Sequence, residues 1–215
     1  MADTQKLTID VVSDVVCPWC YLGKRRLEAA IAQSGEAVEI RWRPYQLDPN
    51  IPAEGVERRA YMEKKFGKGD GLAEAHVLTA LGTAVGIDYR FDAITRAPNT
   101  LDAHRLIRWA ADAGAQDAMV ERLFKLYFEE GRDISDRALL AAVAGEAGLD
   151  AAAVAEALAD GRDLEAVRGE IDQAQRIGVS GVPFFIFAGK FGVPGAQEAS
   201  VLIDAMRQAR AAPAA

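Results

Sequence analysis

The stretch that decides the fold is Val15-Val16-Cys17-Pro18-Trp19-Cys20-Tyr21-Leu22-Gly23. It follows an apolar run and opens a segment with the pattern of a helix. Cys17 and Cys20 are the only two cysteines of the chain. Two thiols at i and i+3 on a first helical turn can close a small disulfide ring. The unpaired N–H groups and the positive dipole end of the helix favour the thiolate of the first thiol. The pattern therefore indicates reversible thiol–disulfide chemistry.

The residues around this motif predict a β-α-β unit. Residues 7–11 alternate between apolar and polar side chains, which is typical of a strand. The segment from Cys17 to about Ser34 is predicted to be a helix that stops at Gly35. Gly23 lowers the helix propensity there but would allow close packing. Residues 38–43 alternate again and predict a second strand with one buried face.

The C-terminal part predicts a β-β-α unit. Residues 184–187 form a short apolar run of the kind found in central strands. Ala188-Gly189 offers a tight hairpin turn, and residues 190–193 offer the return strand. Residues 196–210 are predicted to form a closing helix.

Between these two units, residues 56–178 have an almost entirely helical pattern. Within this block, Ser135 is predicted to cap one helix, and Asp150 and Gly161 to bracket another. The order of the elements is that of an α/β protein, a thioredoxin-like fold with an inserted all-helical domain. We expect residues 1–55 and 179–215 to form the thioredoxin-like domain and residues 56–178 the helical domain.

The composition of the chain narrows the class of protein. A formal net charge of −7 argues against a nucleic-acid binder. No apolar run is long enough to cross a bilayer, and the first residues lack the features of a signal peptide. We therefore expect a cytoplasmic protein without a membrane partner, where a C-x-x-C pair is catalytic or metal-binding more often than structural. A closed metal site requires four ligands. Only His76 and His104 could supplement the one cysteine pair, so no metal is expected.

The two thiols receive different roles. Cys17, at the helix start, is expected to attack a disulfide, and Cys20, one turn further in, to resolve the mixed disulfide without any cofactor. Pro18 suits the first helical turn because its missing N–H would be unpaired there. Trp19 would lie at the mouth of the site, where it either contacts substrate or is a plain surface aromatic.

Val182-Pro183 is the second candidate element. A proline that opens a central strand cannot donate to the ladder, and a cis peptide bond at the strand entry would resolve this; an ordinary trans bond is the alternative. Asp10 and Asp14 flank the first strand. Either could assist proton transfer to Cys20 if it were buried, but we expect both at the surface.

The chain resembles the DsbA-like branch of the thioredoxin superfamily, and within it the FrnE-type proteins. The pieces that carry the resemblance occur in family order over most of the chain: residues 13–23, Trp42-Arg43-Pro44-Tyr45-Gln46-Leu47, Pro98-Asn99-Thr100, Ala103-His104, Gly181-Val182-Pro183 and Pro194-Gly195-Ala196-Gln197. The resemblance implies dithiol–disulfide oxidoreductase activity on protein or small-molecule thiols. It makes Cys17 the nucleophile, Cys20 the resolving thiol and Val182-Pro183 a cis-proline loop. It also makes Asn99 and His104 contributors to substrate binding, although helix capping by Asn99 and packing by His104 are equally compatible with their positions.

Two alternatives remain open. The same pieces resemble kappa-class glutathione transferases and hydroxychromene-carboxylate isomerases, so glutathione could be a co-substrate. Those proteins usually carry a serine at the position of Cys17, and the Gly195-Ala196-Gln197 turn lacks their acidic residue. The other alternative is a non-catalytic, peptide-binding or holdase-like module. The direction of electron flow and the oligomeric state do not follow from the sequence.

Overall fold

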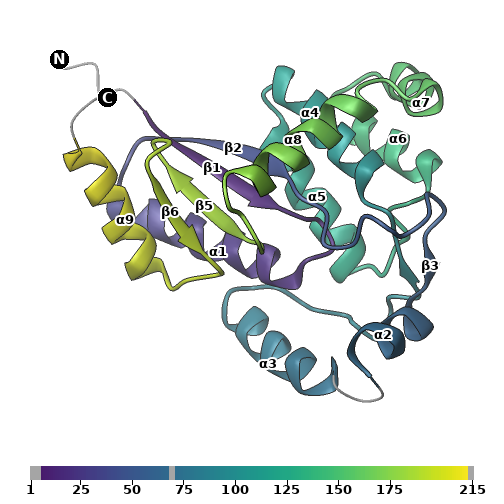
Figure 1. Cartoon of the computed structure of the whole chain (residues 1–215), viewed down its shortest axis with the longest axis horizontal. Helices are drawn as coiled ribbons and strands as arrows, with labels where there is room; N and C mark the ends of the chain where they lie inside the picture. The colour runs from purple at the N-terminus through teal and green to yellow at the C-terminus, as the bar shows by residue number, and fades with distance from the viewer. Residues whose placement is uncertain (1–5, 68–70, 213–215) are drawn as a thin grey trace.

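A computed structural model describes residues 6–67 and 71–212 of the chain, and its centre is a four-stranded sheet (Figure 1). The strands are β1 (Leu7–Ser13), β2 (Val38–Pro44), β5 (Phe184–Phe187) and β6 (Phe191–Pro194), in the order β2-β1-β5-β6. β1 runs parallel to β2 and antiparallel to β5, and β5 and β6 form an antiparallel hairpin. At the turn of the hairpin, Ala188 and Gly189 both have positive φ. The predicted β-α-β and β-β-α units are therefore both present.

Helices cover both faces of this sheet. On one face lie α1 (Pro18–Ser34) and α9 (Ala199–Ala211), which pack against each other (Figure 1). On the other face, Ala174 of α8 (Leu164–Arg176) packs with Val12 of β1. α1 begins with proline in its first turn and ends at Gly35, whose left-handed φ of 68° closes the helix as predicted.

The central block contains the helices α2 (Arg58–Phe66), α3 (Gly71–Ala84), α4 (Leu101–Asp112), α5 (Gln116–Phe128), α6 (Arg137–Glu146) and α7 (Ala151–Asp160), followed by α8. The prediction of an all-helical block was wrong in one respect. β3 (Val56–Glu57) pairs with β4 (Arg96–Ala97) in a small second sheet. Strands of two residues are too short to show an alternating pattern. The division of the chain at these boundaries into two domains stays a prediction.

Two helix ends in this block follow the predicted caps, and a third does not. Asp150 accepts the N–H groups of the first turn of α7, and Gly161 ends that helix with a left-handed φ. Ser135, in contrast, does not cap α6. The cap is Asp136, which accepts two backbone N–H groups, whereas the Ser135 hydroxyl bonds to Asp133. Adjacent serine and aspartate both suit an N-cap, so the sequence pattern alone could not choose between them.

An aromatic cluster joins α1 to the helical block. Tyr21 of α1 stacks on Phe124 of α5 with ring centroids 4.9 Å apart, and its edge meets Tyr89 at 6.0 Å. Trp42 of β2 is 4% exposed and packs edge-on against Phe124, which makes it a core residue. Close to this cluster, the buried Lys24 of α1 lies 3.0 Å from Asp117 of α5. Burial of these large rings stabilises the contact between α1 and the helical block.

Candidate functional site

Cys17 is the residue from which α1 starts. Its backbone is extended, with φ −91° and ψ 111°, and its carbonyl oxygen accepts the N–H of Cys20 at 3.0 Å. The side chain therefore lies beside the free N–H groups of the first helical turn. Both cysteines are free thiols and both are buried. The predicted pair thus stands at i and i+3 on the first turn of a helix.

The loop before β5 lies directly against Cys17. The Sγ of Cys17 is 3.5 Å from the carbonyl oxygen of Val182, and the peptide bond between Val182 and Pro183 is cis. Gly23 allows this approach. A Cβ at that position would lie 3.0 Å from the Cγ of Pro183 and 3.2 Å from the ring of Phe185. A side chain at position 23 would therefore require the rings of Pro183 and Phe185 to move.

Cys20 is hidden behind Cys17 and is 1% exposed. Burial raises the pKa of Cys20 well above its ordinary value, and the hydrogen bond and charge of Cys17 raise it further. The hydroxyl of Ser13 and the backbone N–H of Asp14 act in the opposite direction and lower this pKa. Because the first two effects dominate, Cys20 is a thiol at neutral pH and must lose a proton before it can attack a disulfide.

The two residues between the thiols are held by the helical block. Trp19 is half-buried, and its indole Nε1–H donates to Glu74 of α3 at 2.7 Å. This hydrogen bond holds the Trp19 side chain against the helical block, so the indole is not free at the mouth of the site. The carbonyl oxygen of Pro18 accepts the hydroxyl of Tyr89 at 2.5 Å. Burial and the neighbouring thiols raise the pKa of Tyr89, so its hydroxyl stays protonated.

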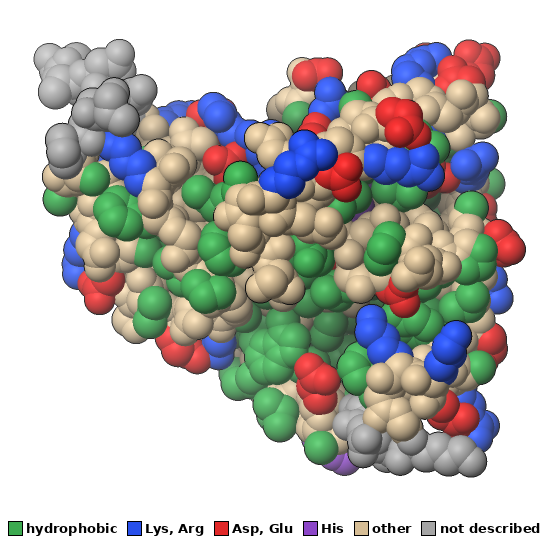
Figure 2. Space-filling view, viewed as in Figure 1, with side chains coloured by type: hydrophobic (Ala, Val, Ile, Leu, Met, Phe, Trp, Pro, Cys, Tyr) green, Lys and Arg blue, Asp and Glu red, His purple; other side chains and the backbone are tan. Residues whose placement is uncertain are grey.

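Cys17, Pro18, Trp19 and Val182 line one cavity of about 300 Å³, here named the thiol cavity. Its remaining walls come mainly from the helical block and are largely apolar, with Leu47, Ile51, Met62, Phe66, Phe91 and Phe128 among them. Figure 2 shows hydrophobic side chains gathered in the hollow above α2 and α3. An apolar hollow lined by Cys17 suits a substrate whose disulfide is flanked by apolar groups.

Asn99 and His104 lie outside the set of residues that line the thiol cavity. The Oδ1 of Asn99 accepts from Gln46 at 3.1 Å and from the N–H of Leu101 at 3.0 Å, and its Nδ2 donates to the carbonyl oxygen of Ile51 at 2.6 Å. The ring of His104 is 3% exposed, and its Nε2 lies 2.9 Å from the carbonyl oxygen of Tyr45. The structure therefore places both in contacts within the chain, and their role in substrate binding stays a prediction.

The expectation for Asp14 was wrong. Its side chain is 1% exposed, accepts the N–H of Leu47 at 2.8 Å, and has its Oδ1 3.4 Å from the Nε2 of His104. The end of β1 turns inward here, which no alternation in the sequence predicts. The side chain of Asp10, in contrast, is 18% exposed and pairs with the half-exposed Arg43 of β2 at 2.7 Å.

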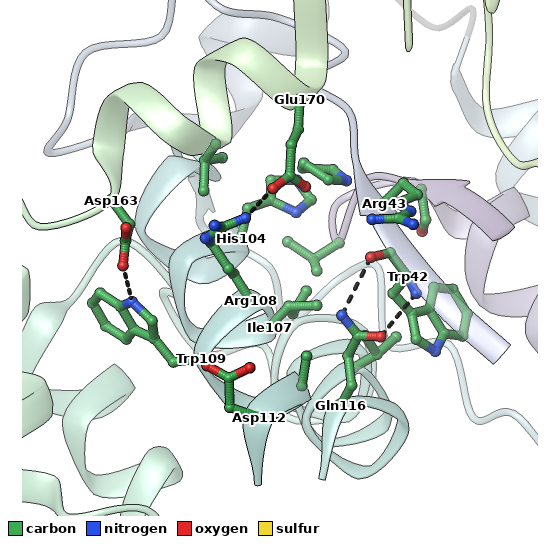
Figure 3. Close-up of a pocket in the computed structure, with 16 residues that line it drawn as sticks. Trp42, Arg43, His104, Ile107, Arg108, Trp109, Asp112, Gln116, Asp163 and Glu170 are labelled. Carbon is green, nitrogen blue, oxygen red and sulfur yellow. Dashed lines mark hydrogen bonds and ion pairs between the residues drawn. The ribbon is translucent and has the colours of Figure 1, made fainter. Parts of the chain in front are cut away.

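A second cavity of about 360 Å³ lies between the ends of β1 and β2 and the helices α4, α5 and α8 (Figure 3). It is lined by Ser13 and His104, and by charged residues that include Arg108 and Glu170, which form an ion pair. At its side, the amide of Gln116 accepts the N–H of Trp42 at 2.9 Å and donates to the carbonyl oxygen of Trp42 at 3.3 Å (Figure 3). Sequence reasoning missed this second cavity, because its residues come from five separate segments.

Within residues 6–67 and 71–212, no three side chains of histidine, cysteine, aspartate or glutamate gather as metal ligands would. In the same part of the chain, each helix is too short or too polar to cross a bilayer.

Comparison with known proteins places this geometry in a family. Residues 8–207 match the family described as "DSBA-like thioredoxin domain". A crystal structure of a probable DsbA oxidoreductase from Streptomyces coelicolor is 32% identical, covers 97% of this chain and 92% of its own, and superposes with a TM-score of 0.87. Two more distant structures share the fold. They are a 2-hydroxychromene-2-carboxylate isomerase (21% identity, 94% and 95% coverage, TM-score 0.71) and the cytosolic disulfide reductase DsbM from Pseudomonas aeruginosa with GSH (21% identity, 95% and 96% coverage, TM-score 0.60). The chain belongs to the family of DsbA-like thioredoxin domains.

Proposed function

We propose that the protein is a cytosolic dithiol–disulfide oxidoreductase in which Cys17 attacks and Cys20 resolves. The observation that carries the proposal is the unequal setting of the two thiols. Cys17 lines the thiol cavity beside the Val182 carbonyl oxygen, whereas Cys20 is buried behind it with a raised pKa. A substrate in the cavity meets only the sulfur of Cys17. The sulfur of Cys20 is in place to attack the resulting mixed disulfide and release the substrate.

The reaction balances without a cofactor. In the reducing direction, the Cys17 thiolate forms a bond to one substrate sulfur, and the other substrate sulfur leaves as a thiolate. Cys20 then loses its proton and attacks Cys17, which releases the first substrate sulfur and leaves a Cys17–Cys20 disulfide. Two electrons pass from the protein to the substrate. The same steps in reverse oxidise a dithiol, and the reduction potential against the surroundings sets the direction.

The apolar walls of the thiol cavity favour a protein or small-molecule disulfide with apolar neighbours as the substrate. The cavity also contains two cationic side chains, Arg58 and Lys65. These could meet the carboxylates of glutathione, so glutathione remains a candidate co-substrate. The same two cations support the second candidate function, a glutathione-dependent isomerase or transferase. That candidate leaves the buried Cys20 without a role.

The experiment that tests the proposal is the substitution Cys20→Ser. In this variant, a mixed disulfide between Cys17 and the substrate should accumulate, because nothing can resolve it. Turnover of a disulfide substrate should fall by about 100-fold or more, as expected when one member of a coupled pair is lost. Mass spectrometry of the intact protein detects the adduct, and Cys17→Ser is the control that should form none.

Two results would contradict the proposal. Full activity of Cys20→Ser on a glutathione-dependent isomerisation, with no adduct on Cys17, would favour the isomerase. Unchanged binding of an unfolded peptide by a variant that lacks both thiols, with no disulfide exchange by the unaltered protein, would favour the holdase-like module.

A further inference from the structure

Tyr89, in the segment after α3, makes a buried contact with the turn that carries the two thiols. Its hydroxyl donates to the carbonyl oxygen of Pro18 at 2.5 Å, although the two residues are 71 positions apart in the chain. Tyr89 is 5% exposed, and burial raises the pKa of its hydroxyl. The group therefore keeps its hydrogen near neutral pH and acts as a permanent donor to this carbonyl.

The packing around the ring of Tyr89 holds this hydroxyl in place. The ring stacks on Phe91 with centroids 5.0 Å apart, and it makes edge contacts with Phe128 at 5.4 Å and with Tyr21 at 6.0 Å. On the side of α3, Gly82 lies so close that an added Cβ would be 2.6 Å from two ring atoms. Because the ring is confined by these neighbours, its hydroxyl has little freedom to leave the carbonyl that it contacts.

The carbonyl of Pro18 shares a peptide group with the N–H of Trp19. This peptide bond is trans and planar, so the carbonyl and the N–H point in opposite directions. As in any α-helix, the carbonyl points toward the C-terminal end of α1, and the N–H points back to the start, where Cys17 is the N-cap. The side chain of an N-cap residue commonly accepts the N–H of the second or third helical residue, and Trp19 is the second.

The N–H of Trp19 is the free donor of the first helical turn. Pro18 has no N–H, and the N–H of Cys20 is bonded to the carbonyl oxygen of Cys17 at 3.0 Å. As a neutral thiol, Cys17 makes no cap hydrogen bond, and its Sγ lies 3.5 Å from the carbonyl oxygen of Val182, to which it can donate. A thiolate has no hydrogen to donate and needs a donor instead. Cys17 carries this charge when it attacks a disulfide and when it leaves one.

We propose, on the basis of the proposed dithiol function, that Tyr89 is a positioning residue: through the Pro18 carbonyl it holds the Trp19 N–H toward the attacking sulfur. Donation to a peptide carbonyl also polarises the peptide group and makes its N–H a stronger donor. Both effects stabilise negative charge on Cys17. They favour the reduced form of the protein, because the sulfurs of the Cys17–Cys20 disulfide are neutral.

The reduction potential of the thiol pair measures this role, and Tyr89→Phe is the variant that tests it. The protein is equilibrated in mixtures of reduced and oxidised glutathione, free thiols are trapped by alkylation, and mass spectrometry gives the fraction of the Cys17–Cys20 disulfide. In Tyr89→Phe the equilibrium should move toward the disulfide by about three- to tenfold, which is the effect expected of one neutral hydrogen bond. This corresponds to a fall in the reduction potential of about 15–30 mV.

A second variant reaches the same contact from α3. In Gly82→Ala, the added Cβ would meet the ring of Tyr89 at 2.6 Å, so the ring and its hydroxyl have to move. The potential should fall as it does in Tyr89→Phe, and the double variant should fall no further, because both substitutions remove one contact. Tyr45→Phe is the matched control. Tyr45 is 8% exposed and lines neither cavity, so its loss of a hydroxyl should leave the potential unchanged.

Thermal unfolding of the reduced and oxidised forms separates positioning from a purely structural role. Tyr89→Phe should destabilise the reduced form more than the oxidised form. Equal destabilisation of both forms, with an unchanged potential, would overturn the proposal and leave Tyr89 a role in the fold alone. An equal fall in the potential of Tyr45→Phe would also overturn it. If the unaltered protein formed no reversible disulfide in these mixtures, the dithiol function itself would fail, and the proposal for Tyr89 with it.

Discussion

Asn99 shows how a single half-buried amide can stabilise the approach to the site. Its side chain takes part in three hydrogen bonds, with Gln46, with Ile51 and with the N–H of Leu101 at the start of α4. The last of these satisfies one of the free N–H groups of the helix, as a cap does. The neighbours Pro98 and Thr100 line the thiol cavity, whereas Asn99 does not. From these contacts we expect Asn99 to hold this loop in place.

We predict that Asn99→Ala lowers the free energy of unfolding by about 1–3 kcal/mol, because three partners each lose a partly buried hydrogen bond. Turnover per folded molecule should stay unchanged. Denaturant titration and a disulfide-reduction assay measure the two quantities, and Asn50→Ala, an exposed asparagine in the preceding loop, is the control. Lower turnover at unchanged stability would instead place Asn99 in substrate binding.

At the scale of elements, α1 and the loop before β5 are fitted to each other through Gly23. The position matters because the same loop holds the Val182 carbonyl oxygen next to Cys17. We predict that Gly23→Ala destabilises the protein by about 1–3 kcal/mol, since a Cβ would meet Pro183 at 3.0 Å and Phe185 at 3.2 Å. Disulfide exchange should also slow, because the loop must move away from the thiol.

The control for this substitution is Gly169→Ala on α8, where an added Cβ meets nothing within 4 Å. Alanine is the better helix former, so this variant should be as stable as the unaltered protein or more so. Thermal unfolding of the two variants provides the comparison. Equal midpoints would show that α1 and the loop can separate without cost.

The elements also show what a single sequence can predict. α1, its end at Gly35 and the hairpin turn at Ala188-Gly189 follow from local patterns, and the structure contains them. The pair β3 and β4 could not be predicted, because two residues have no periodicity. The burial of Asp14 and the second cavity depend on contacts between segments far apart in the chain. Tertiary packing creates these features, and local propensity does not contain them.

At the scale of the whole molecule, charged residues connect the sheet part to the helical block. Lys24 and Arg25 of α1 pair with Glu121 of α5, the former at 3.4 Å. Burial raises the pKa of Glu121, but the hydrogen bond from Arg25 and the charges of Lys24 and Arg25 outweigh it and hold this pKa below its usual range. A carboxyl with a depressed pKa in the folded state stabilises the fold above its unfolded pKa of about 4.3.

We predict that this stabilisation is lost as the pH falls below about 4.3 and through the folded pKa of Glu121. Glu121→Gln should lower the unfolding free energy at neutral pH by about 1–3 kcal/mol and flatten its fall in acid. Chemical denaturation from pH 7 to pH 3 measures both effects. Glu156→Gln, at an exposed position of α7, should keep the acid dependence. If the unfolding free energy of Glu121→Gln fell as steeply in acid as that of the unaltered protein, other carboxyl groups would be responsible for the fall.

The order β2-β1-β5-β6 leaves the sheet with two edges, and each is closed in a different way. At one edge, the amide of Gln116 occupies the backbone N–H and carbonyl oxygen of Trp42 as a neighbouring strand would. At the other edge, β6 has only four residues and ends in Pro194. Exposed strand edges are the usual templates for aggregation and for assembly by strand addition. Protein substrates of the proposed disulfide exchange would therefore meet few backbone groups on which to polymerise.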